Sequence, residues 1–130
     1  MNNVRNLLKK SGYSEKAIEY YLKRVNFGII KNSSCYGIYT GPCGDTMEIY
    51  LRIKDTLILD AKFRAIGCAG SFVSGSALTE MIKKKTIDEA EGINREDVIA
   101  HLGGIPEAKI HCACLAIRTL RRAIKQYKNE

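Results

Sequence analysis

The sequence contains no apolar run that approaches the ~20 residues needed to span a bilayer. Its first residues, from Asn2 to Lys10, are polar and lack the apolar core of a secretory signal peptide. These two absences lead us to expect a cytoplasmic protein, in a compartment where thiols stay reduced. Internal repeats, low-complexity tracts and signs of a second domain are also absent, so we expect one domain over residues 1–130.

A disulfide framework is missing as well. The five cysteines are an odd number, and no two of them form a Cys-x-x-Cys pair. In a reducing compartment, metal binding or thiol chemistry is the better interpretation. Cys43, Cys68 and Cys112 lie 25 and 44 positions apart. Spacing alone therefore leaves a metal or cluster site and a set of unrelated buried cysteines equally open.

The net charge of +7 raises the question of a nucleic-acid partner. The lysines and arginines are spread over several segments and do not alternate with aromatic residues. The single run, Lys83-Lys84-Lys85, falls where a helix is expected to end, and the helix dipole stabilises cations at that end. The charge therefore indicates solvated helix ends and an attraction to acidic protein partners rather than a nucleic-acid interface.

Period-two alternation of apolar residues predicts three strands in the first half of the chain. The first covers residues 35–40, and the second, residues 46–54, places Met47, Ile49, Leu51 and Ile53 on one face. The inner face of the third, residues 57–65, is expected to carry Leu57, Leu59, Ala61, Phe63 and Ala65. Tight turns at 41–45 and 54–56 join them, which predicts an antiparallel meander.

Helical spacing of apolar residues dominates the remainder of the chain. Residues 1–12 are expected to form a short helix or a mobile N-terminal arm, and Ser14 is expected to cap a second helix. Small residues over 71–77 indicate a closely packed helix, and capping signals at Thr86 and Asn94 start two more. Strands followed by helices predict an α+β fold, a three-stranded antiparallel sheet with helices mainly on one face.

Residues 109–114 (Lys-Ile-His-Cys-Ala-Cys) lie at the start of the last segment whose apolar residues have helical spacing. Its apolar members recur on one face: Ala113, Ala116, Ile117, Leu120, Ala123, Ile124 and Tyr127. Cys112 is therefore expected at a helix N-terminus, whose unpaired N–H groups and positive dipole end favour a thiolate. Such positions lower the pKa of a cysteine from about 8.5 to roughly 3.5–7.5, so we expect a reactive thiol there.

The meander brings chemistry-bearing residues to one end of the sheet. The turn that carries Cys43 and Asp45 lies at the same end as the exit of the third strand, where Cys68 follows. Thiolates with an imidazole, here that of His111, select zinc, copper(I) or iron–sulfur species over hard cations. Three thiols, one imidazole and one carboxylate exceed the four ligands of a structural zinc site. The set favours an exchangeable metal or cluster site.

Three motifs occur in a fixed order, namely Gly41-Pro42-Cys43-Gly44-Asp45, Gly67-Cys68 and Lys109-Ile110-His111-Cys112. In these motifs the chain resembles the iron–sulfur cluster scaffold family of IscU and the N-terminal domain of NifU. The resemblance implies an IscU/NifU-like α+β scaffold that assembles a labile [2Fe–2S] cluster and passes it to apo-acceptor proteins. It implies a cysteine desulfurase, an iron donor and an electron donor as partners, and Zn²⁺ at the site when no cluster is present. It leaves open a homodimer around a shared cluster.

The resemblance also implies roles for individual residues. By position, Cys43, Cys68 and Cys112 are the family thiols and His111 is the neighbouring ligand. Asp45 stands where an acidic residue keeps the site labile, which fits a carboxylate because it is a harder, weaker ligand for iron than thiolate. Cys112 is expected to accept persulfide sulfur, in a step parallel to thiol–disulfide exchange, and Lys109 to lie beside the cluster. We thus expect a scaffold and carrier, not an enzyme.

Two departures from the family pattern change the expectations. The segment Ile105-Pro106-Glu107-Ala108-Lys109 replaces the leucine-proline-proline-valine-lysine sequence that an Hsp70-type chaperone recognises, which argues against that partner. Cys35 and Cys114 are additional to the family thiols. Because free cysteine packs as a small hydrophobe, both are expected to fill the core.

Two other functions stay open. One is a zinc-containing sulfur acceptor that stimulates a desulfurase, as in the SufU branch. It is disfavoured because the 44-position gap has no room for that branch's insertion and because His111 is present. The other is a zinc-stabilised basic domain that binds nucleic acid, which would hold its zinc permanently and lose affinity steeply with salt.

Overall fold

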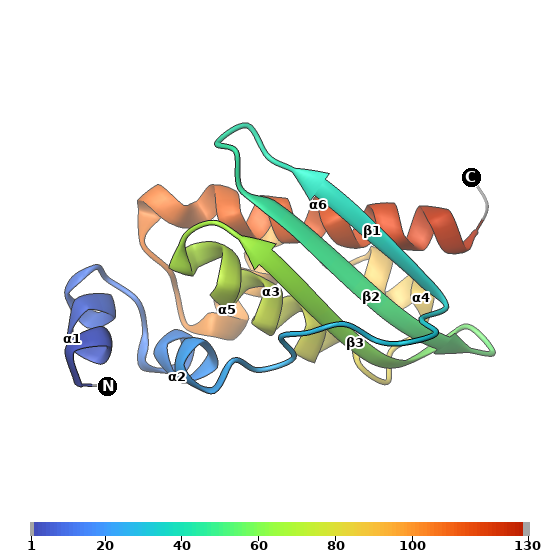
Figure 1. Ribbon diagram of the computed structural model, residues 1–130, viewed down its shortest axis with the longest axis horizontal. Coiled ribbons are helices and arrows are strands. Elements are labelled where there is room, and N and C mark those ends of the chain that lie inside the picture. The colour runs from blue at the N-terminus through green and yellow to red at the C-terminus, as the bar shows by residue number, and fades with distance from the viewer. Residues whose placement is uncertain (1, 129–130) are drawn as a thin grey trace.

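The computed structural model describes residues 2–128, in which six α-helices and one short 3-10 helix accompany three strands (Figure 1). In chain order these are α1 (Asn2–Lys10), α2 (Glu15–Lys23), β1 (Cys35–Thr40), β2 (Thr46–Lys54), β3 (Leu57–Ile66), α3 (Ala69–Ile82), α4 (Ile87–Glu91), α5 (Arg95–Leu102), η1 (Glu107–Lys109) and α6 (Ile110–Tyr127). Over this described range, no helix combines the length and the hydrophobicity that crossing a membrane requires.

The strands form one antiparallel sheet in the order β1-β2-β3, as the alternation predicted. Thr46, at the start of β2, pairs with Thr40 on one side and with Ile66 on the other. The β1–β2 loop and the exit of β3 therefore lie at the same end of the sheet. This arrangement confirms the meander and sets the loop residues 41–45 beside the β3–α3 junction.

Helices cover one face of the sheet and leave the other open (Figure 1). In that view α3 and α6 run behind the strands, and the strand residues that face them are fully buried: Met47, Ile49, Leu51, Ala61 and Phe63. On the opposite face, Tyr36 and Ile38 are 44% and 42% exposed, and Tyr36 stacks on Tyr50. The predicted α+β fold with helices mainly on one face is confirmed.

The expected inner face of β3 is wrong at the start of the strand. Ile58 is fully buried and Leu59 is 44% exposed, the reverse of the simple alternation. The register gives the reason, because Arg52 pairs with Asp60 and Ile53 with Ile58, which leaves Leu59 as an extra residue. This β-bulge shifts the alternation by one position, and the predicted pattern holds again once the bulge has passed.

The predicted helix starts are present. Ser14 caps α2 by accepting a hydrogen bond from the Ala17 N–H, and Thr86 and Asn94 each form a capping box at α4 and α5. The first residues form α1, which is joined to α2 by ion pairs from Arg5 to two glutamates. Its mobility as an arm stays a prediction.

Small residues let α3 lie close to β3. A Cβ on Gly75 would lie only 2.5 Å from the Phe63 ring. Ser74 and Ser76, next to it, are at most 1% exposed. The Ser76 hydroxyl donates a hydrogen bond to the Val25 carbonyl at 2.8 Å, whereas the Ser74 hydroxyl has no hydrogen-bond partner among residues 2–128.

Replacing Ser74 with alanine is expected to raise the free energy of unfolding by about 1 kcal/mol, because a buried hydroxyl without a partner is lost and alanine favours the helix. Ser76→Ala is the matched control. The same change of atoms removes a hydrogen bond there, so stability should fall by about 1 kcal/mol. Urea denaturation measures both changes. A Ser74→Ala variant that is no more stable than Ser76→Ala would contradict this account.

Candidate metal centre

Asp45 and the first turn of α3 form one hydrogen-bonded unit at the end of the sheet. Cys68 is the N-cap residue of α3. Asp45 Oδ2 accepts hydrogen bonds from Ser71 Oγ at 2.7 Å, from the Cys68 N–H at 3.4 Å and from the Cys68 thiol at 3.5 Å. The bond from Ser71 is the main cause that lowers the pKa of Asp45 below its ordinary value. Asp45 is therefore an ionised carboxylate that can serve as a metal ligand. It is anchored at a helix N-terminus, where negative charge is favoured.

Two glycines around Cys68 leave room for the donor groups. A Cβ on Gly67 would lie 2.5 Å from the Asp45 carboxylate, and one on Gly70 would lie 2.9 Å from Cys112 Sγ. No side chain fits at either position without moving a donor. The glycines thus allow the β3–α3 junction to approach both Asp45 and the start of α6.

The Cys68 and Cys112 thiols face each other between the start of α3 and the start of α6. Cys68 Sγ lies 3.6 Å from Cys112 Sγ, and both cysteines are free. Two thiolates bound to one tetrahedral metal with metal–sulfur bonds of about 2.3 Å stand roughly 3.8 Å apart. The observed separation is close to that value, so a single metal ion can be bound by both sulfurs with little rearrangement.

His111 adds an imidazole to this pair. Its Nε2 atom lies 3.6 Å from Cys112 Sγ, and donor atoms of Asp45, His111 and Cys112 all lie within 4.8 Å of one another. Since Cys68 Sγ is also close to Asp45 and Cys112, four of the five predicted donors meet in one place. Cys112 is buried, Cys68 and Asp45 are half-buried, and His111 is exposed, so the centre opens to solvent on the histidine side.

Cys43 does not belong to this tight group. It is exposed on the β1–β2 loop. It lines a hollow of about 160 Å³ together with Asp45 and His111, which we call the Cys43 hollow. The loop residue thus stands at the open side of the centre, next to two of the four grouped donors.

The expected low pKa of Cys112 is wrong. Cys112 is the third residue of α6, near the N-terminus as predicted, but its side chain is fully buried. Burial raises the pKa of the Cys112 thiol, and the neighbouring Cys68 thiol raises it further. Loss of water around the sulfur thus favours the neutral thiol over the thiolate, the reverse of the effect expected from the helix N-terminus.

Two residues of the centre were not among the predicted site residues. Tyr13 is 7% exposed, and its hydroxyl lies within 3.3 Å of the Cβ position of Gly70, beside Cys112. Burial raises the pKa of Tyr13 to about 12. Ser71 was interpreted only as a small packing residue, yet it anchors Asp45. Its position in the first turn after Cys68 is the signal that could have identified it, because such residues face a group at the helix N-terminus.

Lys109 is half-buried at the junction of η1 and α6, with its Cβ near the Cβ position of Gly70. A role beside bound cargo stays a prediction. Of the two additional cysteines, Cys35 is 3% exposed in the core, as predicted. Cys114 is not core filler, which corrects that expectation. It is half-buried, lines the Cys43 hollow and accepts a hydrogen bond from Arg95 Nη1 at 3.5 Å.

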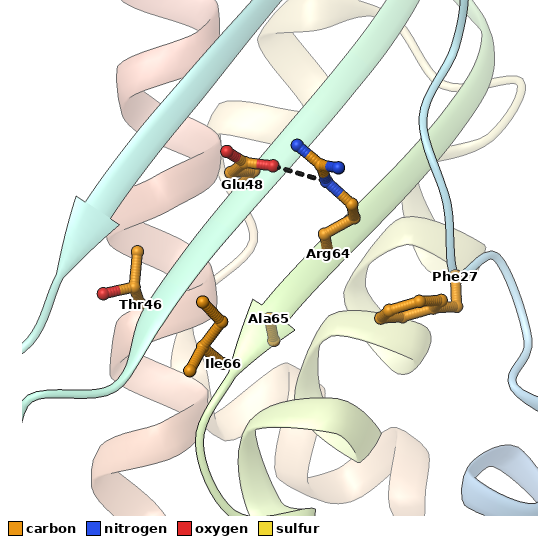
Figure 2. A pocket seen from close by; sticks show the side chains of 6 residues that line it. All are labelled: Phe27, Thr46, Glu48, Arg64, Ala65 and Ile66. Carbon is orange, nitrogen blue, oxygen red and sulfur yellow. Dashed lines mark hydrogen bonds and ion pairs between the residues drawn. The ribbon is translucent and has the colours of Figure 1, made fainter.

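A larger hollow of about 350 Å³ lies apart from these donors. Figure 2 shows it between the Glu48–Arg64 ion pair, which joins β2 to β3, and Phe27 beside β3. Its remaining lining residues are Thr46, Ala65 and Ile66. The lining holds no thiol or imidazole, so the chemistry of soft-metal binding belongs to the smaller site.

Comparisons with known proteins identify relatives over most of the chain. The family model described as NifU-like N terminal domain matches residues 12–130. The iron–sulfur cluster assembly scaffold protein IscU 1 of Archaeoglobus fulgidus is 44% identical over 116 residues, which cover 88% of this chain and 76% of that protein. The scaffold protein IscU of Escherichia coli is 37% identical over 123 residues, covering 91% of this chain and 95% of that protein.

Solved structures of similar proteins have the same fold. The N-terminal NifU-like protein of Brucella abortus superposes with a TM-score of 0.75 at 15% identity, covering 95% of this chain and 99% of that chain. A protein from Fervidobacterium islandicum is described as a putative iron–sulfur cluster assembly scaffold protein for the SUF system. It superposes with a TM-score of 0.72 at 26% identity, covering 87% of this chain and 96% of that chain. The family model and the curated relatives span most of the chain, and the chain therefore belongs to the family of NifU-like N-terminal domains.

Proposed function

We propose that this protein is a scaffold on which a labile [2Fe–2S] cluster is assembled from iron and persulfide sulfur and then transferred to apo-acceptor proteins. The observation that carries the proposal is the grouping of Asp45, Cys68, His111 and Cys112 at one solvent-open end of the sheet. A closed tetrathiolate site retains its metal, whereas this mixed donor set suits exchange. The naming of relatives as cluster assembly scaffolds supports the proposal.

In this proposal the donors have different tasks. Cys68 and Cys112 bind the cargo from the inner side, where their sulfurs are already 3.6 Å apart. Cys43 closes over it from the exposed loop and supplies a third thiolate. His111 or Asp45 takes the fourth position, and replacement of a thiolate by the Asp45 carboxylate is the step at which the cluster becomes transferable. The cluster and its iron are cargo of the protein, and Zn²⁺ binds the same donors when no cluster is present.

Sulfur enters through Cys112. The Cys112 thiol loses its proton, and the resulting thiolate attacks the outer sulfur of a persulfide on the desulfurase. The persulfide S–S bond breaks, and the desulfurase cysteine leaves as a thiolate that takes up a proton in turn. Cys112 is fully buried in this conformation, so the step requires the start of α6 to be uncovered when the desulfurase docks. A role for Lys109, beside Cys112 at that start, is to pair with the incoming persulfide anion.

Cys112→Ser is expected to lose persulfide labelling, whereas Cys43→Ser is expected to keep it. Both proteins are incubated with cysteine and a desulfurase, and mass spectrometry of proteolytic peptides then shows which cysteine gains the mass of one sulfur atom. The pair is matched, because each variant lacks one thiol of the same centre. Labelling of Cys112→Ser as complete as that of the parent would assign sulfur acceptance to another thiol, with the exposed Cys43 as the first candidate.

The whole proposal is tested by anaerobic reconstitution with ferrous iron, cysteine and a desulfurase. Visible charge-transfer bands that form on this protein and disappear when an apo-ferredoxin is added are the expected result. Tight zinc without cluster formation, together with stimulation of the desulfurase, would favour a sulfur acceptor of the SufU type. The similarity to the Fervidobacterium islandicum protein makes this the second candidate. Permanent zinc with salt-sensitive binding of nucleic acid would favour the basic-domain alternative.

A further inference from the structure

Cys114 and His111 lie on the same face of α6. They are three positions apart, a spacing that places side chains side by side on a helix. Both line the Cys43 hollow, whose wall also contains Cys43 and Asp45. Cys112 instead points to the buried side of α6 toward Cys68. The molecule therefore presents two pairs of thiols, an inner pair of Cys68 and Cys112 and an outer pair of Cys43 and Cys114, with His111 between them.

The outer pair has the room and the freedom that a metal ion requires. The Cys43 hollow measures about 160 Å³, enough for an ion with several waters at about 30 Å³ each. His111 and Cys114 are held in place by the helix. Cys43 lies on an exposed loop next to Gly44, around which a Cβ would meet no atom within 4 Å. The open space beside this loop leaves room for the Cys43 sulfur to approach the two donors on the helix.

The charges around the outer pair also match a divalent ion. Two thiolates and the Asp45 carboxylate would carry three negative charges, which one divalent ion and the Arg118 guanidinium in the wall of the hollow balance. Arg95, which donates to Cys114 Sγ, is exposed and paired through its Nε with Glu96 at 2.7 Å. Exposed contacts of this kind are weak, so Arg95 can turn away when Cys114 binds metal.

We propose that the Cys43 hollow is a second metal position, in which Cys43, His111 and Cys114 bind a thiophilic divalent ion such as Zn²⁺ or Cd²⁺. The thiols lose their protons on binding and the ion exchanges its water for sulfur and nitrogen donors. His111 serves one ion at a time, so an ion in the outer position is one ligand exchange away from the inner donors. The outer position would thus serve as the place where metal enters before it passes to the inner donors. This use rests on the proposed scaffold function, but the binding of the ion does not.

The test is anaerobic titration with Cd²⁺, followed by the near-ultraviolet thiolate-to-cadmium absorption and by equilibrium dialysis. The parent protein is expected to bind two ions, one held by Asp45, Cys68 and Cys112 and one by Cys43, His111 and Cys114, whereas Cys114→Val binds only one. In the Cys68→Ser/Cys112→Ser double variant, which lacks the inner thiols, one ion remains. Adding Cys114→Val or Cys43→Ser to that background is expected to weaken binding by more than the roughly 10- to 100-fold that changes around metal ligands cause.

Matched controls separate the site from a general thiol effect. Cys35→Ala removes a thiol that is buried in the core, 3% exposed, and leaves the number of bound ions at two. The Cys43→Ser/Cys114→Val double variant is expected to lose no more affinity for Cd²⁺ at the outer position than either single variant, because each single change already removes a ligand of the same site. One ion on the parent, or binding by Cys114→Val equal to the parent, overturns the second position. Cluster assembly by Cys114→Val is measured separately, so failure of the scaffold proposal is distinguishable from failure of this one.

Discussion

Gly37→Ala is expected to lower the free energy of unfolding by about 3 kcal/mol, the upper end of the range for overpacking a core. Gly37 lies in the middle of β1, opposite Ile49 of β2, at the point where α6 crosses the strand. A Cβ there would lie 2.4 Å from the Ala123 nitrogen and 2.6 Å from the Thr119 oxygen. Both contacts are backbone atoms of α6, which cannot rotate away as a side chain can, so the helix must move off the sheet.

Thermal and urea unfolding measure this effect. For a chain of this length, about 3 kcal/mol corresponds to a fall in Tm of roughly 10 °C. Gly92→Ala is the matched control, because Gly92 has a negative φ and a Cβ there would meet its nearest atom at an ordinary 3.5 Å. Its stability should change by about 0.5 kcal/mol or less. A Gly37→Ala protein that unfolds within a few degrees of the parent would show that β1 and α6 do not depend on this close approach.

The fold was predictable where local pattern and tertiary environment agree. The alternation in β2 and the capping residues Ser14, Thr86 and Asn94 identified their elements correctly. The bulge at Leu59 was not predictable from the alternation, because an extra residue in β3 is visible only from its pairing with β2. Likewise, the sequence places Gly37 in a predicted strand but contains no signal of the close approach of α6. Its role depends on the positions of Thr119 and Ala123 in α6, more than eighty residues away.

In the candidate site, too, some features were predictable from the sequence and others depend on the tertiary fold. The topology of a meander places Asp45 and Cys68 at one end of the sheet, whereas His111 and Cys112 were placed beside them only by the family resemblance. The protonation state of Cys112 could not, since helix position predicts a low pKa and only burial, a property of the whole fold, reverses it. Cys114 was misplaced for a related reason. Free cysteine packs as a small hydrophobe, which predicted a core position, whereas Cys114 is half-buried and lines the Cys43 hollow.

Asp45 is the donor whose replacement should change cargo release most. Ser71 and the start of α3 hold its carboxylate in contact with the Cys68 thiol, within ligand distance of the group that includes His111 and Cys112. A carboxylate in that position can replace a thiolate on iron, one bond at a time, as the cluster leaves. Without it, release requires the direct breaking of stronger iron–sulfur bonds, so removal of Asp45 should trap the cluster.

Asp45→Ala is therefore expected to slow cluster transfer to an apo-ferredoxin about tenfold, equivalent to about 1.4 kcal/mol in the activation barrier, while the cluster still forms. Transfer is followed by the loss of the visible bands from this protein and their appearance on the acceptor. Asp45→Asn separates the two possible causes, because the amide can still accept the Ser71 hydrogen bond but is a much poorer ligand for iron. If ligand exchange controls release, Asn behaves as Ala does. Transfer at the parental rate by Asp45→Asn would mean that Asp45 only positions the α3 N-terminus, and faster transfer by Asp45→Ala would contradict the role of the carboxylate altogether.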